Sequence, residues 1–219
     1  MEDNNKPNRQ EAAAGGPLII CIGRQLGSGG RFVARQLADE FGCRLYDKEI
    51  LNLAAKESGF SEKFFEQNDE QKGFMKSLFH LHTPHVSDTN FYSSRFSQES
   101  LFQFQSDAIL KAAQEGNCVF VGRCADYVVR EMDRVVSVFI TANLDERAAR
   151  VMERHGCDRE EALKIIHSKE NTRSSYYNYY TGRKWGDGAN YDLCVNSSLL
   201  GIEGTARLIS RFIRERFGL

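Results

Sequence analysis

A glycine-rich stretch near the N-terminus has the layout of a loop that binds phosphate. Gly27, Ser28, Gly29 and Gly30 separate the apolar run 18-LIICI-22 from a segment with helical periodicity. Glycines allow a tight turn, and backbone N–H groups at the start of the following helix can then point at an anion. The stretch therefore predicts either a phosphate-binding loop or a structural turn between a strand and a helix.

The lysine that such loops usually carry is missing. When Gly29 is aligned with the second glycine of G-x-x-x-x-G-K-[ST], Arg24 takes the place of the first glycine and Gly30 that of the lysine. Arg31 then stands where a serine or threonine belongs, and Phe32 stands where the pattern G-x-G-x-x-G needs its third glycine. Phosphate binding is thus indicated by the placement of the loop rather than by its side chains.

Two arginines flank the loop, and either could supply the missing charge. A guanidinium holds phosphate oxygens through paired hydrogen bonds, and phosphoryl transfer depends mainly on positioning and on neutralising the transferred group. Of Arg24 and Arg31, we expect Arg31 to replace the lysine. The alternative is that Arg31 is a solvated residue of the first helical turn, where a cation is mildly unfavourable unless an anion is bound.

Two more charged residues follow short apolar runs. Asp47 comes after 43-CRLY-46, and Arg123 comes after 118-CVFV-121. Doubly wound sheets gather their ligands at the carboxyl ends of their strands. Asp47 could help to hold Mg²⁺ through water or orient an acceptor, or it could simply cap the next helix. Arg123 could bind a phosphate, or it could be a surface residue paired with Asp126.

Short apolar runs alternate with segments of helical period along the chain, which predicts an α/β fold, a three-layer sandwich with a five-stranded parallel sheet. Nearly continuous apolar character suits strands that are buried on both faces. The strands are expected at residues 18–22, 43–46, 118–121, 135–140 and 191–195. Helices are expected at residues 31–41, 47–58, 98–115, 145–156 and 203–217.

Two segments interrupt this alternation. Residues 61–97 mix polar residues with scattered aromatic ones, so we expect a mobile insertion or a flap covered by a partner. Residues 158–190 begin as a charged helix and continue into a tyrosine-rich stretch from residue 173, in a place where α/β enzymes carry lids. The polar residues 1–16 are expected to be a disordered tail, and residues 17–219 a single domain. Two clusters have an open role. One could bind zinc: His80, His82 and His85. The other could stack on a base or pack the lid: Tyr176, Tyr177, Tyr179, Tyr180 and Trp185.

The composition argues against several classes of partner. The net formal charge is -1, so no basic field favours nucleic acid or an anionic membrane surface. No run approaches the roughly 18 apolar residues of a membrane span. The six cysteines form no C-x-x-C pair, which suits reduced thiols. We expect a soluble, cytoplasmic protein that binds neither nucleic acid nor membrane, and the sequence leaves its oligomeric state open.

The chain resembles the cytidylate kinase-like family, a divergent branch of the nucleoside monophosphate kinases. The similarity spans about residues 17–217, and its G-S-G-G-R loop is that branch's variant of the G-S-G-K-G-T of true cytidylate kinases. The similar stretches are I-C-I-G-R-Q-L-G-S-G-G-R-F-V-A-R-Q-L-A, 45-LYDKEIL-51, 121-VGRCADYVV-129, 138-VFITANLDERAAR-150 and 190-NYDLCVNSS-198.

This resemblance implies a P-loop kinase core with a monophosphate-binding insertion at residues 61–97 and an arginine-bearing lid at residues 154–185. It implies that the glycine loop binds the donor phosphates, with ATP and Mg²⁺ as cofactors. Arg123 would hold the acceptor phosphate, Asp47 would lie at the acceptor entrance, and Arg173 of the lid would neutralise the transferred group together with Arg31.

The implied reaction moves the γ-phosphoryl group of ATP to a nucleoside monophosphate, with CMP as the acceptor that the family suggests. The chain departs from true cytidylate kinases in having 122-GRCAD-126 for G-R-D and 166-IHSKENTR-173 for R-D-x-x-D-x-x-R. Two other functions therefore stay open. One is a catalytically weak regulator that binds nucleotides, and the other is a kinase for a different small acceptor.

Overall fold

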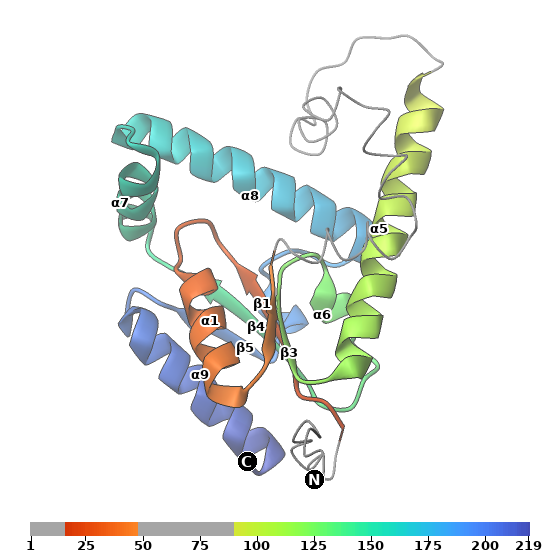
Figure 1. Ribbon diagram of the computed structural model, residues 1–219. Helices are drawn as coiled ribbons and strands as arrows, with labels where there is room; N and C mark the ends of the chain where they lie inside the picture. The colour runs from red at the N-terminus through yellow and green to blue at the C-terminus, as the bar shows by residue number, and fades with distance from the viewer. Residues whose placement is uncertain (1–15, 48–89) are drawn as a thin grey trace, which may run out of the picture.

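The computed structural model describes residues 16–47 and 90–219, which form a parallel sheet between layers of helices (Figure 1). Five strands lie in the order β2-β3-β1-β4-β5, and all neighbouring pairs are parallel. The predicted α/β fold with a five-stranded parallel sheet is confirmed. The strands are β1 Ile19–Arg24, β2 Arg44–Tyr46, β3 Cys118–Val121, β4 Val135–Thr141 and β5 Leu193–Asn196.

The central strand β1 is longer than its sequence suggested. We expected it to end at residue 22, where the apolar run ends. Instead Gly23 and Arg24 continue the ladder and pair with Phe139 and Ile140 of β4. Backbone pairing with a long neighbour therefore holds Arg24 in the sheet rather than in the loop.

Helices cover both faces of the sheet (Figure 1). Along β1, Ile20 and Ile22 pack on the side of α1 and α9, whereas Ile19 and Cys21 pack on the side of α5 and α6. This alternation is what a strand buried on both faces requires. The covering helices are α1 Gly30–Phe41 and α9 Gly201–Phe217 on one face, and α5 Asn90–Glu115 and α6 Ala125–Val128 on the other.

Two more helices form the end of the molecule beyond the strand ends. α7 (Leu144–His155) leads into α8 (Arg159–Thr181), and α8 crosses this end from α7 to α5 (Figure 1). The expectation that the helix gives way to an irregular stretch at residue 173 is wrong. Tyr176 and Tyr180 lie one turn apart and both contact Phe102 of α5, so the tyrosines extend the helix.

The predicted insertion at residues 61–97 is also corrected at its end. Helix α5 begins at Asn90, so residues 90–97 are helical rather than irregular. The predictions for residues 1–15 and 61–89 fall outside the described residues, as does all but the first residue of the helix expected at 47–58. His80, His82 and His85 lie there too. The short 3-10 helix η1 (Gly188–Asn190) precedes β5.

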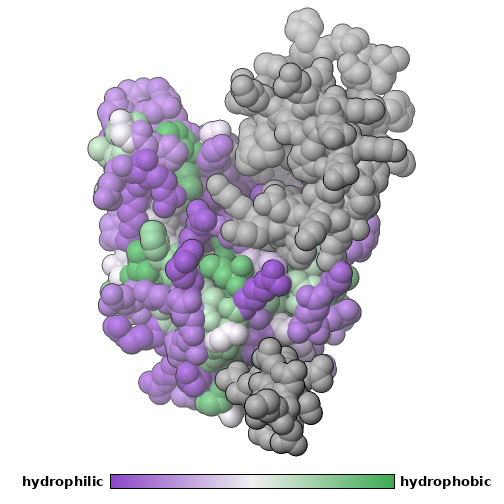
Figure 2. Space-filling model, viewed as in Figure 1, coloured by the Kyte–Doolittle hydropathy of each residue, from purple (hydrophilic) through white to green (hydrophobic). Residues whose placement is uncertain are grey.

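The face shown in Figure 2 is largely hydrophilic, and its hydrophobic residues gather in separate patches. Within residues 16–47 and 90–219, no helix combines the length and apolar character that crossing a membrane requires.

Candidate phosphate-binding site

The glycine loop lies at the point where the order of the strands in the sheet reverses. β1 and β3 are neighbours, but the chain leaves β1 for α1 on one face and leaves β3 for α6 on the other. Open α/β sheets bind ligands in the crevice that forms at the carboxyl ends of two such strands. The loop after β1 and the turn after β3 therefore meet where the topology predicts a ligand.

The loop opens helix α1 with its N–H groups uncapped. Gly27 and Gly29 have φ angles of 80° and 79°, and Gly29 is the N-cap residue of α1. Gly29 has no side chain with which to cap the helix, so the N–H groups of Gly30 and Arg31 have no intrahelical acceptor. Ser28 is fully buried, and its hydroxyl donates to the Gln25 carbonyl oxygen at 3.0 Å. Such N–H groups suit an anion, and the Ser28 hydroxyl faces inward.

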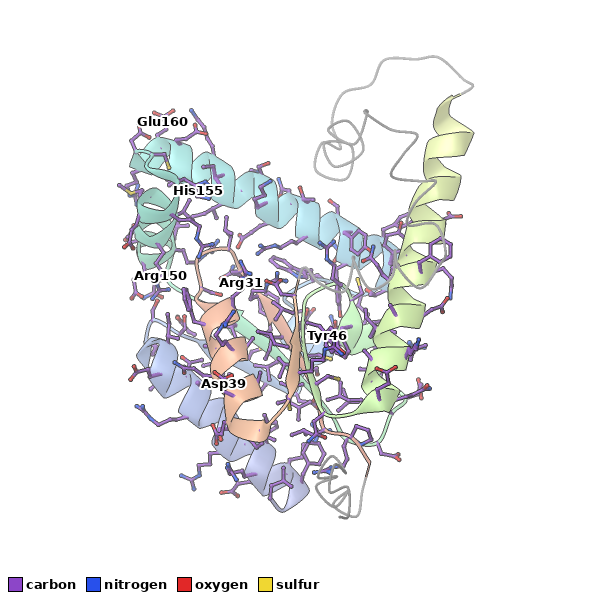
Figure 3. All side chains as sticks on the ribbon, in the orientation of Figure 1. Arg31, Asp39, Tyr46, Arg150, His155 and Glu160 are labelled. Carbon is purple, nitrogen blue, oxygen red and sulfur yellow. The ribbon has the colours of Figure 1, made fainter. Side chains whose placement is uncertain are left out.

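Helices α7 and α8 hold the loop in place. Arg147 Nε donates to the Leu26 carbonyl oxygen at 2.8 Å, and its Nη2 lies 2.5 Å from Glu170 Oε1. The same Glu170 oxygen accepts from the Leu26 N–H at 3.2 Å. Arg150, labelled on α7 in Figure 3, donates to the Gly27 carbonyl oxygen at 2.8 Å. A buried ion pair thus fixes the backbone of the loop from both sides of Leu26.

The turn after β3 is built in a different way. Gly122, Arg123 and Cys124 follow one another with φ angles of 76°, 62° and 56°. Residues other than glycine are uncommon in this left-handed region, and such strain gathers at functional sites. Tyr177 on α8 donates to Asp126 Oδ2 at 2.7 Å and ties the helix that follows this turn to α8. The strained turn therefore presents Arg123 from a fixed backbone.

Four guanidinium groups surround the crevice, with Asp47 among them. Arg31 Nε lies 2.5 Å from Asp47 Oδ2, and Arg24 Nη2 lies 3.7 Å from Asp47 Oδ1. Arg173 on α8 donates to the Arg24 carbonyl oxygen at 3.2 Å. Arg123 is close enough to lower the pKa of both Arg24 and Arg173 through charge repulsion.

Burial makes this positive charge costly. It is the main cause that lowers the pKa of Arg24 to about 9; Arg173 lowers it further and Asp47 opposes the shift. Burial also lowers the pKa of Arg173, with Glu170 and Asp47 opposing. A bound anion would remove this cost, since an opposite charge close to a guanidinium favours its charged form. The crevice is therefore suited to an anion of more than one charge.

The sequence model of the cytidylate kinase-like family matches residues 19–199. The chain belongs to this family.

Relatives in this family resemble the chain over nearly its whole length. The cytidylate kinase of Pyrococcus horikoshii is 29% identical over 198 residues, which cover 90% of this chain and 88% of that protein. The cytidylate kinase of Thermococcus kodakarensis is 29% identical over 200 residues, which cover 90% and 89%. The crystal structure of an uncharacterized protein from Eubacterium ventriosum is similar at 28% identity with a TM-score of 0.68, covering 90% of this chain and 98% of that one.

In this member of the cytidylate kinase-like family, the residues expected at the site lie close together, but their pairings differ from those expected. Arg31, labelled at the start of α1 in Figure 3, is paired with Asp47, and its side chain is 54% exposed. Asp126, weighed as a partner of Arg123, instead accepts a hydrogen bond from Tyr177. Residues 48–58, where the helix that Asp47 was expected to cap would lie, are outside the described residues.

Arg24 is the residue whose importance the sequence did not reveal. Its side chain is 17% exposed and lies within the cluster, whereas Arg31 is the more exposed of the two. One signal was available, because Arg24 stands where the phosphate-loop pattern has its first glycine. An arginine at a position that normally needs a glycine indicates a rearranged loop.

The tyrosines of α8 join elements together rather than forming an open stacking surface. Tyr180 stacks on Phe102 with ring centroids 4.2 Å apart, and Tyr176 packs against both rings. Tyr177 is buried against Asp126 and Tyr191. Trp185 meets Phe139 edge-on at 5.1 Å. The cluster anchors α8 over the carboxyl ends of the strands, which keeps Arg173 beside the loop.

The site fits the phosphates of a nucleotide better than it fits a metal ion alone. Among the residues that the structure describes, no three His, Cys, Asp or Glu side chains are placed to hold a metal ion. Magnesium in phosphoryl-transfer sites commonly keeps several waters and is bound by one or two carboxylates together with substrate phosphates. Asp47 could contact such an ion through water, and the metal would supply further neutralisation of the phosphate charge.

Proposed function

We propose that this protein is a nucleoside monophosphate kinase that transfers the γ-phosphoryl group of ATP to CMP. The observation that carries this proposal is the convergence of four guanidinium groups beside the glycine loop, at the carboxyl ends of neighbouring strands. The named activity of relatives such as the Pyrococcus horikoshii enzyme supports CMP as the acceptor.

The chemistry needs charge neutralisation more than acid–base catalysis. An oxygen of the acceptor phosphate attacks the γ-phosphorus, the bond from that phosphorus to the β–γ bridging oxygen breaks, and ADP and CDP leave. A phosphate monoester has its second pKa near about 6, so the attacking oxygen is already ionised at neutral pH. No covalent intermediate and no general base are needed, and positioning is the main task of the protein.

The residues of the site divide this task. The N–H groups of Gly27, Ser28, Gly29 and Gly30 would bind the β-phosphate of the donor. Arg173 would neutralise the transferred group from α8, and Arg31, half exposed on α1 and paired with Asp47, would add a smaller share of positive charge. Arg123 would hold the acceptor phosphate, and Asp47 would orient the acceptor.

A kinase assay over a panel of nucleoside monophosphates tests this proposal. With ATP and Mg²⁺, ADP and CDP should form in equal amounts and only when CMP is present. Arg173→Ala should lower kcat by about 10²–10³-fold, because it removes one preorganised donor to the transferred group. Arg35→Ala is the control, since Arg35 is an exposed arginine on α1, one turn after Arg31. Absence of acceptor-dependent ADP formation with every nucleoside monophosphate would overturn the proposal.

A regulator that binds nucleotides without turnover is the second candidate. It is favoured by the missing lysine and by the pairing of Arg31 with Asp47, because a paired guanidinium is less available to a phosphate. This candidate predicts that ATP raises the melting temperature, as a ligand of the native state must, while no acceptor in the panel is phosphorylated. Turnover with a small acceptor other than a nucleoside monophosphate would indicate a kinase of different specificity.

A further inference from the structure

The side chain of Arg24 occupies the space in which a lysine at position 30 would begin. A Cβ atom added to Gly30 would lie 2.7 Å from Arg24 Cβ and 3.1 Å from Arg24 Cγ. Both of these atoms belong to the stem of Arg24, next to the paired backbone of β1, so they cannot swing away as the end of a flexible side chain can. Any side chain at position 30 must therefore compete with Arg24 for the same volume.

The head of Arg24 is accommodated by a second glycine. A Cβ atom added to Gly122 would lie 2.1 Å from Arg24 Nη1. The guanidinium thus rests directly on the backbone of the turn that carries Arg123. Asp47 Oδ1 is 3.7 Å from Arg24 Nη2, which is longer than a hydrogen bond, and Asp47 also pairs with Arg31. Two glycines make room for a buried cation whose charge is only partly balanced.

We infer that Arg24 replaces the loop lysine: the cation has moved from the first turn of α1 to the end of β1, and its arrival excludes a lysine at position 30. In the pattern G-x-x-x-x-G-K-[ST] the first position is glycine and the lysine reaches the β- and γ-phosphates. Here the two residues have exchanged roles, so that Arg24 carries the charge and Gly30 provides the space. The inference rests on the proposed function and assigns a further catalytic residue to the same site.

The exchange has a physical advantage in the absence of nucleotide. A cation at the N-terminus of a helix is unfavourable unless an anion is bound, and β1 has no such dipole at its end. From β1, the fork of a guanidinium can still reach two phosphate oxygens at once, whereas an ammonium group acts as a point charge. Arg24 also lies among Arg31, Arg123 and Arg173, each of which lowers its pKa, so the anion that binds there is shared by several cations.

Exchanging the two residues back tests this inference. The variants are Arg24→Gly, Gly30→Lys and the double variant Arg24→Gly/Gly30→Lys, with Arg35→Ala as the control. Each is checked by thermal unfolding, then assayed for kcat with ATP and CMP, and titrated with ATP by calorimetry. Arg24→Gly should lower kcat by about 10²–10³-fold. Gly30→Lys should also lower it, because the lysine collides with Arg24. The kcat of the double variant should exceed that of Arg24→Gly by at least about tenfold.

This reciprocal rescue separates a catalytic role from a structural one, because a residue that merely supports the loop would not be replaced by a lysine elsewhere. Wild-type turnover in Arg24→Gly, or no gain in the double variant, overturns the inference and leaves the proposed function standing. If the wild type phosphorylates no acceptor, the proposed function fails. The ATP titrations then still test whether Arg24 replaces the lysine. Affinity lost in Arg24→Gly and regained in the double variant supports the exchange, whereas affinity unchanged in Arg24→Gly overturns it.

Discussion

The turns that follow β1 and β3 lie side by side at one edge of the sheet, yet they are built on opposite principles. The turn after β1 uses glycines where φ is positive, at residues 27 and 29, and leaves the N–H groups of Gly30 and Arg31 without an intrahelical acceptor. The turn after β3 holds Arg123 and Cys124 at positive φ, where glycine would be less strained. The first turn lacks side chains at these positions and exposes its backbone, whereas the second is strained and carries the Arg123 side chain.

This difference suggests which part of each turn does the binding. A backbone that binds phosphate through N–H groups needs close approach, so side chains there would be in the way. A turn that delivers a guanidinium needs the arginine, and the surrounding structure must hold it. Each turn has its own support: Arg147 and Glu170 hold the first, and Tyr177 holds the helix that follows the second.

Arg123→Gly would affect function most and would test the strain directly. Turnover should fall by about 10²–10³-fold, as for loss of a preorganised donor. The free energy of unfolding should rise by about 1 kcal/mol, because glycine adopts a positive φ without the penalty that a Cβ atom brings. Chemical denaturation and the kinase assay measure the two effects. Arg123→Ala is the control that loses the guanidinium but keeps the strain, and equal stabilities of the two variants would contradict the account.

Glu170→Gln would weaken the support of the first turn. It leaves Arg147, whose side chain is 6% exposed, without its carboxylate. Removing one partner of a buried ion pair strands the other charge, so the free energy of unfolding should fall by about 3 kcal/mol. Denaturant unfolding measures this change. The matched control is Glu160→Gln, which breaks an exposed pair with Lys164 on the same helix and should cost less than about 1 kcal/mol. Similar costs for both variants would show that the buried pair is not a support.

Tyr177→Phe would weaken the support of the second turn by about 2 kcal/mol at neutral pH, since it removes a hydrogen bond to a charged group. Burial raises the pKa of Asp126, and the bond from Tyr177 partly opposes this. The folded state therefore binds the proton more tightly than the unfolded chain, and stability falls as pH rises from about 4 through the folded pKa.

Without the Tyr177 hydroxyl the pKa of Asp126 rises further, so the loss should be greater at pH 7 than at pH 4, where a smaller share of Asp126 is ionised in the folded state. Unfolding experiments at the two pH values measure the difference. Tyr179→Phe is the control, because Tyr179 is 58% exposed on the same helix. A loss independent of pH would mean that the hydroxyl serves packing alone.

Arg31→Ala should have the smallest effect and would sharpen the contrast between the two flanking arginines. Its ion pair with Asp47 is half exposed on the side of Arg31. Because Arg31 is more exposed than Arg24, and Arg24 carries the charge of the missing lysine, turnover should fall by less than about tenfold. The kinase assay compares this variant with Arg35→Ala, which should match the wild type. A loss of a hundredfold or more would make Arg31, rather than Arg24, the replacement for the lysine.

Much of the fold could be predicted from the sequence because it depends on local pattern. Apolar runs placed every end of the five strands to within two residues, and the glycine loop was correctly placed between β1 and α1. The errors have a common origin. β1 extends to Arg24 because β4 continues beside it, and α8 extends to Thr181 because its tyrosines meet Phe102 of α5. In each case a partner distant in sequence overrode the local signal.

The candidate site shows the same division more sharply. Residue types and spacing were enough to indicate a phosphate loop without lysine and to single out Asp47 and Arg123, and the family resemblance added Arg173. Sequence alone could not show that Arg147 donates to the Leu26 carbonyl oxygen, or that Glu170 binds both Arg147 and the Leu26 N–H.

The sequence by itself determined the order of the elements, the place of the loop and the cations available to it. Only the tertiary structure decided which cation can replace the lysine. That choice follows from the exclusion of one side chain by another: Arg24 and a side chain at position 30 would fill the same volume, and the head of Arg24 lies where a Cβ atom at position 122 would collide with it. Shared volume is a property of residues brought together by folding, and no local pattern along the chain records it.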